Sequence, residues 1–228
     1  MSLNDIKTLD VDGALRDAEA AVAGDTRANF FRKAAIGGGS VLASGTIMGM
    51  LPSLASAAKP SAKQDIAILN FALTLEFLEA AFYKQGVKNA GLSGEGLAFA
   101  KLVAGHEATH VKTLKSVLKG AAVKEPKFDF GKATTDADTF LATAFVLENT
   151  GVHAYLGQAA NLLNPALLTA AATIVTIEAR HAAGIATILG DGPFGKGKMS
   201  ITPDGAFDVP FTKKKVLKAV GKTKFIQG

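Results

Sequence analysis

Apolar residues recur every three or four positions through most of the chain between Gln64 and Gly190, which is the spacing of amphipathic helices. Residues that favour helix ends divide this stretch into four segments. The predicted helices cover about 64–90, 93–120, 135–163 and 164–190. Gly91 suits the end of the first helix, and Asn164-Pro165 suits the start of the fourth. The central part of the chain is therefore predicted to be all-α.

Loop lengths predict how the helices pair. Short loops join the first helix to the second and the third to the fourth, so each pair is expected to be antiparallel. The connection at 120–134 is longer, and about 14 extended residues reach roughly 46 Å. That length allows one long crossover along a four-helix bundle, which we place at 59–190. In the tail, 191–228, a short helix is predicted after Thr212. The tail is expected to pack on the bundle through Phe207, Phe211 and Phe225.

The first 58 residues have the order of an export signal. A short basic cluster is followed by an uncharged stretch, 34–58, rich in Gly, Ala and Ser. This stretch contains Ala55-Ser56-Ala57, the small-residue pattern that signal peptidase cleaves. We predict export to the periplasm or cell envelope and a mature N-terminus near Ala58 or Lys59. The region resembles a twin-arginine signal in which Ala28 replaces the second arginine. An uncleaved membrane anchor or a buried helix is the alternative.

Composition excludes several classes of site. The chain of 228 residues has no cysteine, so disulfides, cysteine-ligated zinc and iron–sulfur clusters are ruled out. The formal net charge is +5, and residues 190–228 hold eight lysines against three aspartates. No basic stripe with interleaved aromatics is present, so nucleic-acid binding has no support. The tail lysines are interpreted as a solvated surface, with weak contact to an anionic envelope polymer or membrane surface as the alternative.

One motif occurs twice. The first copy is Glu76, then Tyr83, then Glu107-x-x-His110, and the second is Glu148, then Tyr155, then Glu178-x-x-His181. Each residue of the second copy lies 71 or 72 positions after its counterpart. The copies contain the only two tyrosines and two of the four histidines of the chain. A duplicated helical hairpin with its polar groups in register is therefore predicted.

These residue types at this spacing favour a pair of metal ions. Residues three apart on a helix share a face, so each Glu-x-x-His can bind one ion from one helix. Two divalent cations would neutralise the four carboxylates, whose burial without counter-charge would be costly. The predicted ligands are Glu76, Glu107, His110, Glu148, Glu178 and His181.

Five further residues bear on the predicted site. Tyr83 and Tyr155 are expected to assist it by donating hydrogen bonds to carboxylates on neighbouring helices. Glu79 competes with Glu76 as a ligand, but its counterpart in the second copy is Gly151, so Glu76 is preferred. His106 and His153 are taken as non-ligands.

The chain resembles the ferritin-like domain family over roughly 62–190. The strings that carry the resemblance are LNFALTLEFLEAAFY, AGHEATHVKTL, AFVLENTGVHAYLG and IVTIEARHAAGIA. Exported bacterial and desiccation-related members are most similar, and they share the tail string FDVPFTKKKVLKAV. The resemblance implies a di-iron or di-manganese site in which Glu107 and Glu178 bridge the two metals. Haem-binding relatives use a mid-helix methionine, and no methionine lies at such a position here.

Two functions are predicted. The first is redox chemistry: a ferroxidase, a di-iron oxidase or a manganese-catalase-like enzyme that reacts with O₂ or H₂O₂ in oxidative stress. The second is a non-catalytic role in metal storage or in the envelope as a stress or structural protein. His and carboxylate ligands accept Fe, Mn, Co or Zn, so the residues alone leave the metal open. Assembly into a homo-oligomer is also left open.

Overall fold

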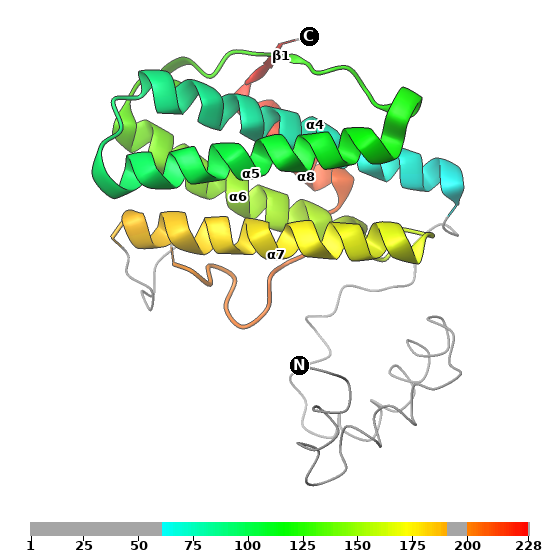
Figure 1. Cartoon of the computed structure of the whole chain (residues 1–228). Helices are drawn as coiled ribbons and strands as arrows, with labels where there is room; N and C mark the ends of the chain where they lie inside the picture. Colours follow the sequence, from blue (N-terminus) through cyan, green and yellow to red (C-terminus); the bar gives the residue numbers. More distant parts are fainter. Residues whose placement is uncertain (1–60, 191–199, 228) are drawn as a thin grey trace, which may run out of the picture. The chain divides into compact units, whose positions relative to one another are not determined.

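Four long helices run side by side in the computed structural model, which describes residues 61–190 and 200–227 (Figure 1). The helices are α4 (Ala62–Asn89), α5 (Gly94–Leu118), α6 (Ala137–Ala159) and α7 (Pro165–Ile188). Their bounds lie within a few residues of those predicted. We call these four helices the bundle. The predicted export signal at 1–58 lies outside the described residues.

Three of the four bundle helices, α4, α6 and α7, begin where a side chain satisfies the backbone. Asp136 accepts a hydrogen bond from the Thr139 amide at 2.8 Å at the start of α6. Asn164 does the same for Ala166 at 2.9 Å at the start of α7, where Pro165 follows as the first helical residue. Both are polar N-caps that pair otherwise free amides of the first turn. These local signals explain why the sequence locates the helices well.

The long connection from α5 to α6 returns along the bundle (Figure 1). It contains two 3₁₀ turns, η3 (Lys119–Ala121) and η4 (Gly131–Thr134), and a short strand, β1 (Lys127–Phe128). Asn70 on α4 holds this connection in place through both polar atoms of its side-chain amide. Its Nδ2 donates to the Ala121 carbonyl at 2.9 Å, and its Oδ1 accepts from the Val123 amide at 2.8 Å.

The interior holds two clusters of buried apolar side chains. One contains Phe82, Tyr83 and Phe140, and the other contains Leu73 and Tyr155. On each of the four helices, the repeated glutamate lies between a member of one cluster and a member of the other. The acidic residues are therefore enclosed in the middle of the bundle with an apolar layer on both sides.

The described part of the tail contacts the bundle. Helix α8 (Lys213–Thr223) packs against α6, and β2 (Ile226–Gln227) pairs antiparallel with β1. Phe211 and Phe225 pack against the first apolar cluster, as predicted. The prediction for Phe207 is wrong: its side chain is 73% exposed, because it lies in an irregular segment before α8.

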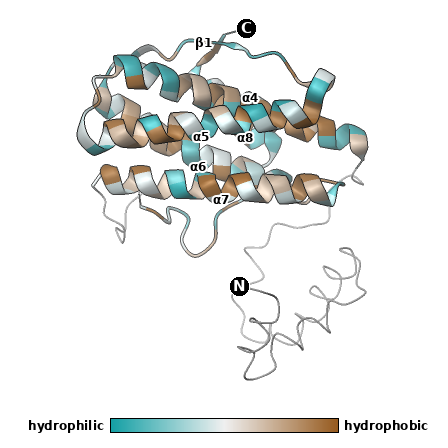
Figure 2. Ribbon diagram, in the orientation of Figure 1, coloured by the Kyte–Doolittle hydropathy of each residue, from teal (hydrophilic) through white to brown (hydrophobic). Residues whose placement is uncertain are grey.

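Hydropathy along the helices is mixed rather than uniform, with brown and teal stretches alternating (Figure 2). Among the described helices, α4 is long and apolar enough to span a membrane by length and composition. However, 61% of its apolar window is buried inside the structure, and it carries the buried acids Glu76 and Glu79. In this structure α4 is one of the four helices that enclose the core of the bundle.

Candidate metal centre

Each helix of the bundle contributes one fully buried glutamate to the centre. Glu76 comes from α4, Glu107 from α5, Glu148 from α6 and Glu178 from α7, and none is more than 1% exposed. The two histidines of the motif lie one turn beyond Glu107 and Glu178 and are also buried. The structure thus brings together all six side chains that the sequence selects.

The six side chains form two overlapping groups. The first group is Glu76, Glu107, His110 and Glu178; the second is Glu107, Glu148, Glu178 and His181. Within each group the potential ligand atoms all lie within 4.8 Å of one another, so each group can hold a metal ion. Glu107 and Glu178 belong to both groups, which is the arrangement that two metals bridged by carboxylates require.

Both histidines turn the same ring nitrogen, Nδ1, toward the carboxylates. His110 Nδ1 lies 3.2 Å from Glu76 Oε2 and 3.1 Å from Glu178 Oε1. His181 Nδ1 lies 3.1 Å from Glu148 Oε2 and 3.2 Å from an oxygen of Glu107. Each nitrogen therefore faces carboxylates from several helices at once.

Some of these contacts are not ordinary hydrogen bonds. Glu107 Oε1 and both oxygens of Glu178 are fully enclosed and accept no hydrogen bond of acceptable geometry within the described residues. Enclosed carboxylate oxygens without a donor are costly. The distances are short while the angles are poor because nitrogens and oxygens point into a shared space. Convergence of this kind fits a cation better than it fits pairing among the side chains.

The ferritin-like domain family model matches residues 64–191. The chain belongs to the ferritin-like domain family. No curated protein matches the chain. Membership agrees with the helical architecture and with a cluster that can bind metal.

The two tyrosines of this ferritin-like domain bond crosswise between α4 and α6. Tyr83 on α4 donates to Glu148 Oε1 on α6 at 2.5 Å. Tyr155 on α6 donates to Glu76 Oε1 on α4, also at 2.5 Å. Both bonds are buried, and they leave the second oxygen of each carboxylate facing a histidine. The hydrogen bonds predicted from sequence are present, and they fix the rotamers of two of the predicted ligands.

Without metal, protons carry the compensating charge of this centre. Burial raises the pKa of Glu76 and of Glu148 well above the usual value, and the charge of Glu178 adds to the rise. Burial opposes charge on His110 and His181, but the surrounding carboxylates outweigh it. They raise the pKa of His110 to about 12 and that of His181 to about 11. A bound cation would displace these protons.

Glu107 is the exception among the acids. Burial acts to raise its pKa, but the nearby rings of His110 and His181 outweigh that effect and lower the pKa to about 2. Glu107 is therefore ionised in the folded protein even without metal. An ionised carboxylate shared by both groups is suited to contact two cations.

His106 is a partner that the sequence did not reveal. Its Nδ1 lies 2.9 Å from Nε2 of His181, and the two rings stack 5.1 Å apart. A contact at Nε2 orients the His181 ring so that Nδ1 points into the centre, as the partners of metal-binding histidines do. The only signal in the sequence was that His106 adjoins Glu107, and its partner lies on another helix.

His153 and Glu79 differ in where they lie. His153 is away from the centre: it stacks on Phe211 at 4.1 Å, and its Nε2 is 3.5 Å from Asp204. Glu79 is buried beside the centre but belongs to neither group of potential ligands.

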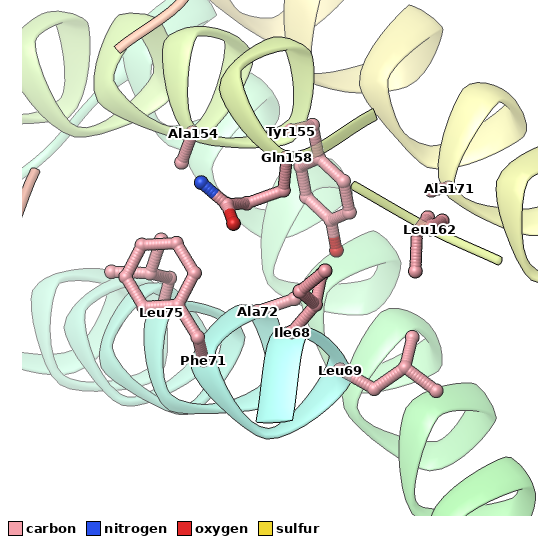
Figure 3. A pocket seen from close by; sticks show the side chains of 10 residues that line it. All are labelled: Ile68, Leu69, Phe71, Ala72, Leu75, Ala154, Tyr155, Gln158, Leu162 and Ala171. Atoms are coloured by element: carbon pink, nitrogen blue, oxygen red, sulfur yellow. The ribbon is translucent and has the colours of Figure 1, made fainter. Parts of the chain in front are cut away.

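A small apolar pocket adjoins Tyr155 (Figure 3). Its walls come from α4, α6 and α7 and from Leu162 in the loop before α7, and Gln158 is the polar side chain at its edge besides the tyrosine. The remaining lining residues are Ile68, Leu69, Phe71, Ala72, Leu75, Ala154, Leu162 and Ala171. Because Tyr155 also bonds to Glu76, one side chain separates this pocket from the metal-binding groups.

Proposed function

We propose that this ferritin-like domain binds two divalent metal ions, iron or manganese, and uses them in redox chemistry with O₂ or H₂O₂. One observation carries the proposal: among the residues that the structure describes, three fully enclosed carboxylate oxygens, on Glu107 and Glu178, have no hydrogen-bond donor. They converge with the Nδ1 atoms of two histidines. The four carboxylates of the groups would balance the charge of two divalent ions.

The ligand assignment follows the two groups. Glu76 and His110 would hold one ion, Glu148 and His181 would hold the other, and Glu107 and Glu178 would contact both. The set contains carboxylates and imidazoles only, which suits iron and manganese as well as zinc. When bound, a pair of iron(II) ions would supply the two electrons that reduction of O₂ to peroxide, or of peroxide to water, consumes, and a pair of manganese ions would disproportionate peroxide.

The protein's own residues support this use in three ways. The tyrosine hydroxyls hold Glu76 and Glu148 in fixed orientations. The apolar clusters on both sides keep water from the centre. The apolar pocket beside Tyr155 offers an uncharged molecule such as O₂ a route that a charged substrate would not take.

The enclosure of the centre favours a second candidate, a non-catalytic role. All six residues are at most 8% exposed, and the pockets beside them are small. A buried pair of metal ions would hold the four helices together, as structural metals do. Metal storage or an envelope stress role would need nothing more.

Consumption of O₂ and H₂O₂ separates the two candidates. The full chain is loaded with Fe(II), Mn(II) or, as a redox-inert reference, Zn(II), and both oxidants are followed. We expect the iron or the manganese form to consume an oxidant, the zinc form to be inactive, and Glu178→Gln to lose the activity. Glu95→Gln, on the exposed first turn of α5, is the matched control and should stay active. Inactivity of both loaded forms would leave the non-catalytic role.

We also propose export, on the basis of residues 1–58 alone. Cleavage after Ala57 or Ala58 would release the domain with its complete helix bundle, since α4 begins at Ala62. Intact mass of the protein isolated from its native cell measures this directly. Retention of residues 1–57 would contradict the proposal.

A further inference from the structure

Glu79 is a buried acid that is not one of the six predicted ligands. It lies on α4, three residues after Glu76, and its side chain is 3% exposed. Within the described residues, no hydrogen bond or ion pair reaches its carboxylate. A buried carboxylate without a partner is costly, so its position calls for an explanation.

Gly151 lies opposite this carboxylate on α6. A Cβ atom built on Gly151 would lie 3.6 Å from Glu79 Oε1 and 3.6 Å from Glu178 Oε2. Both are ordinary contact distances, so the glycine leaves a space the size of a methyl group between the two acids. One of these acids belongs to the proposed metal centre and the other does not. Glu79 and Gly151 are also equivalent positions of the duplicated motif, 72 residues apart. Because Gly151 has no side chain, there is room for Glu79 beside it.

A second small pocket borders this space. It lies between α4, α6 and α8, is partly open, and is lined by Glu79 and Gly151 together with Leu75, Leu78, Leu147, Thr150 and Val220. The fully enclosed unpaired oxygens of the described residues belong to Glu107 and Glu178 and not to Glu79, whose carboxylate faces the pocket. From the outside inward, the order is therefore the pocket, the Glu79 carboxylate, the methyl-sized space and Glu178.

We propose that Gly151 and Glu79 form a port through which divalent cations reach the metal centre. The inference rests on the proposed function, and it gives Glu79 the role of a transit ligand. A cation that leaves water needs oxygen ligands along its path, because an apolar passage cannot replace its hydration shell. Glu79 offers the first carboxylate oxygens in the pocket, and Glu178 offers the next across the space at Gly151. Thr150 is the other polar side chain of the lining, and its hydroxyl donates to the Val146 carbonyl at 2.7 Å. The remaining lining residues are apolar, so the path depends on this pair.

The rate of metal uptake tests the port separately from the centre. Metal-free full-length protein is mixed rapidly with Co²⁺, whose visible absorption reports coordination, and equilibrium stoichiometry is measured on the same samples. Gly151→Ala fills the space, and Glu79→Gln replaces the carboxyl group with an amide of nearly the same shape. Gly105→Ala on the exposed face of α5, where a Cβ meets nothing within 4 Å, is the control for added helix propensity. Glu95→Gln is the control for loss of one acid.

We expect Gly151→Ala and Glu79→Gln to bind as much Co²⁺ as the wild type at equilibrium but to take it up at least about tenfold more slowly, which corresponds to about 1.4 kcal/mol in barrier. Both controls should load at the wild-type rate. Equal rates in all five proteins would overturn the port, as would equal slowing in the controls. If Gly151→Ala does not fold, Glu79→Gln alone decides the matter. A wild type that binds no Co²⁺ at equilibrium would overturn the metal centre itself and the port with it, whereas a rate result alone bears only on the port.

Discussion

Tyr83 on α4 donates a buried hydrogen bond to Glu148 on α6, and the distance between Tyr83 Oη and Glu148 Oε1 is 2.5 Å. The duplicated partner, Tyr155, makes the same bond to Glu76 in the opposite direction. Two helices are therefore joined twice at the level of the proposed ligands. Each bond holds one carboxylate oxygen and leaves the other free for a histidine or a cation.

Tyr83→Phe should weaken both the fold and the metal centre. The variant keeps the ring but leaves an oxygen of Glu148 unpaired in the interior, which costs about 1–3 kcal/mol of unfolding free energy. Loss of an orienting partner should also lower metal affinity about 10–100-fold. Thermal unfolding of the metal-free protein and a metal titration measure the two effects. A variant equal to the wild type in both would show that the bond orients nothing.

His106→Ala should impair one metal position more than the other. His106 contacts Nε2 of His181, whereas no equivalent side chain contacts His110 among the described residues. We expect a Co²⁺ titration that is close to one step in the wild type to separate into a tight and a weak step. His153→Ala, which alters a contact with the tail and not the centre, is the control. Equal weakening of both positions, or none, would remove the orienting role of His106.

Gly86→Ala should destabilise the bundle. A Cβ on Gly86 would lie within 2.9 Å of three ring atoms of Phe140, and this ring also stacks on Phe82 at 4.5 Å. The core would have to move, so we expect a loss of about 1–3 kcal/mol despite the gain in helix propensity. Denaturant unfolding measures it, with Gly105→Ala as the exposed control. A stabilised Gly86→Ala would mean that α4 and α6 are not packed as closely as described.

The metal-free protein should become less stable as the pH rises from about 5 to about 8. Glu76 and Glu148 have folded pKa values raised above 4.5, and those of His110 and His181 are about 12 and about 11 against 6.5. In this range the folded state therefore binds more protons than the unfolded state. Each excess proton lowers the unfolding free energy by about 1.4 kcal/mol per pH unit.

Glu107 has the opposite effect on the pH dependence of stability, but only at lower pH. Its stabilising effect is present above 4.5 and is lost as the pH falls toward its folded pKa of about 2. Metal binding displaces protons, so the rise in melting temperature on adding metal should grow with pH over the same range. Melting temperatures with and without metal at several pH values test this. A metal-free protein that gains stability between about pH 5 and 8 would contradict it.

The sequence predicts what depends on local patterns. Helix bounds follow from caps such as Asp136 and Asn164, which act within one turn. The six predicted ligands and the tyrosines follow from a repeat whose copies need only helical geometry to share a face. Contacts between helices were harder to predict. The offset of 72 identified Gly151 as the counterpart of Glu79 but did not show that the two positions face one another.

The errors and omissions have the same origin. Phe207 was expected to pack on the bundle together with Phe211 and Phe225. Burial depends on the path of the tail, which leaves Phe207 exposed and places Phe211 against His153. The contact of His106 with His181 joins α5 to α7 and appears only when those helices are placed side by side.

Metal content is the most direct test of the central claim, that six side chains from four helices hold two cations. The full chain is purified from cells grown with iron and manganese, without chelators, and is compared with Glu107→Ala and His181→Ala by elemental analysis. We predict about two metal ions per chain for the wild type, as in other bundles with this ligand set, and a clear loss in both variants. A wild type without stoichiometric metal, or variants that retain it in full, would contradict the account.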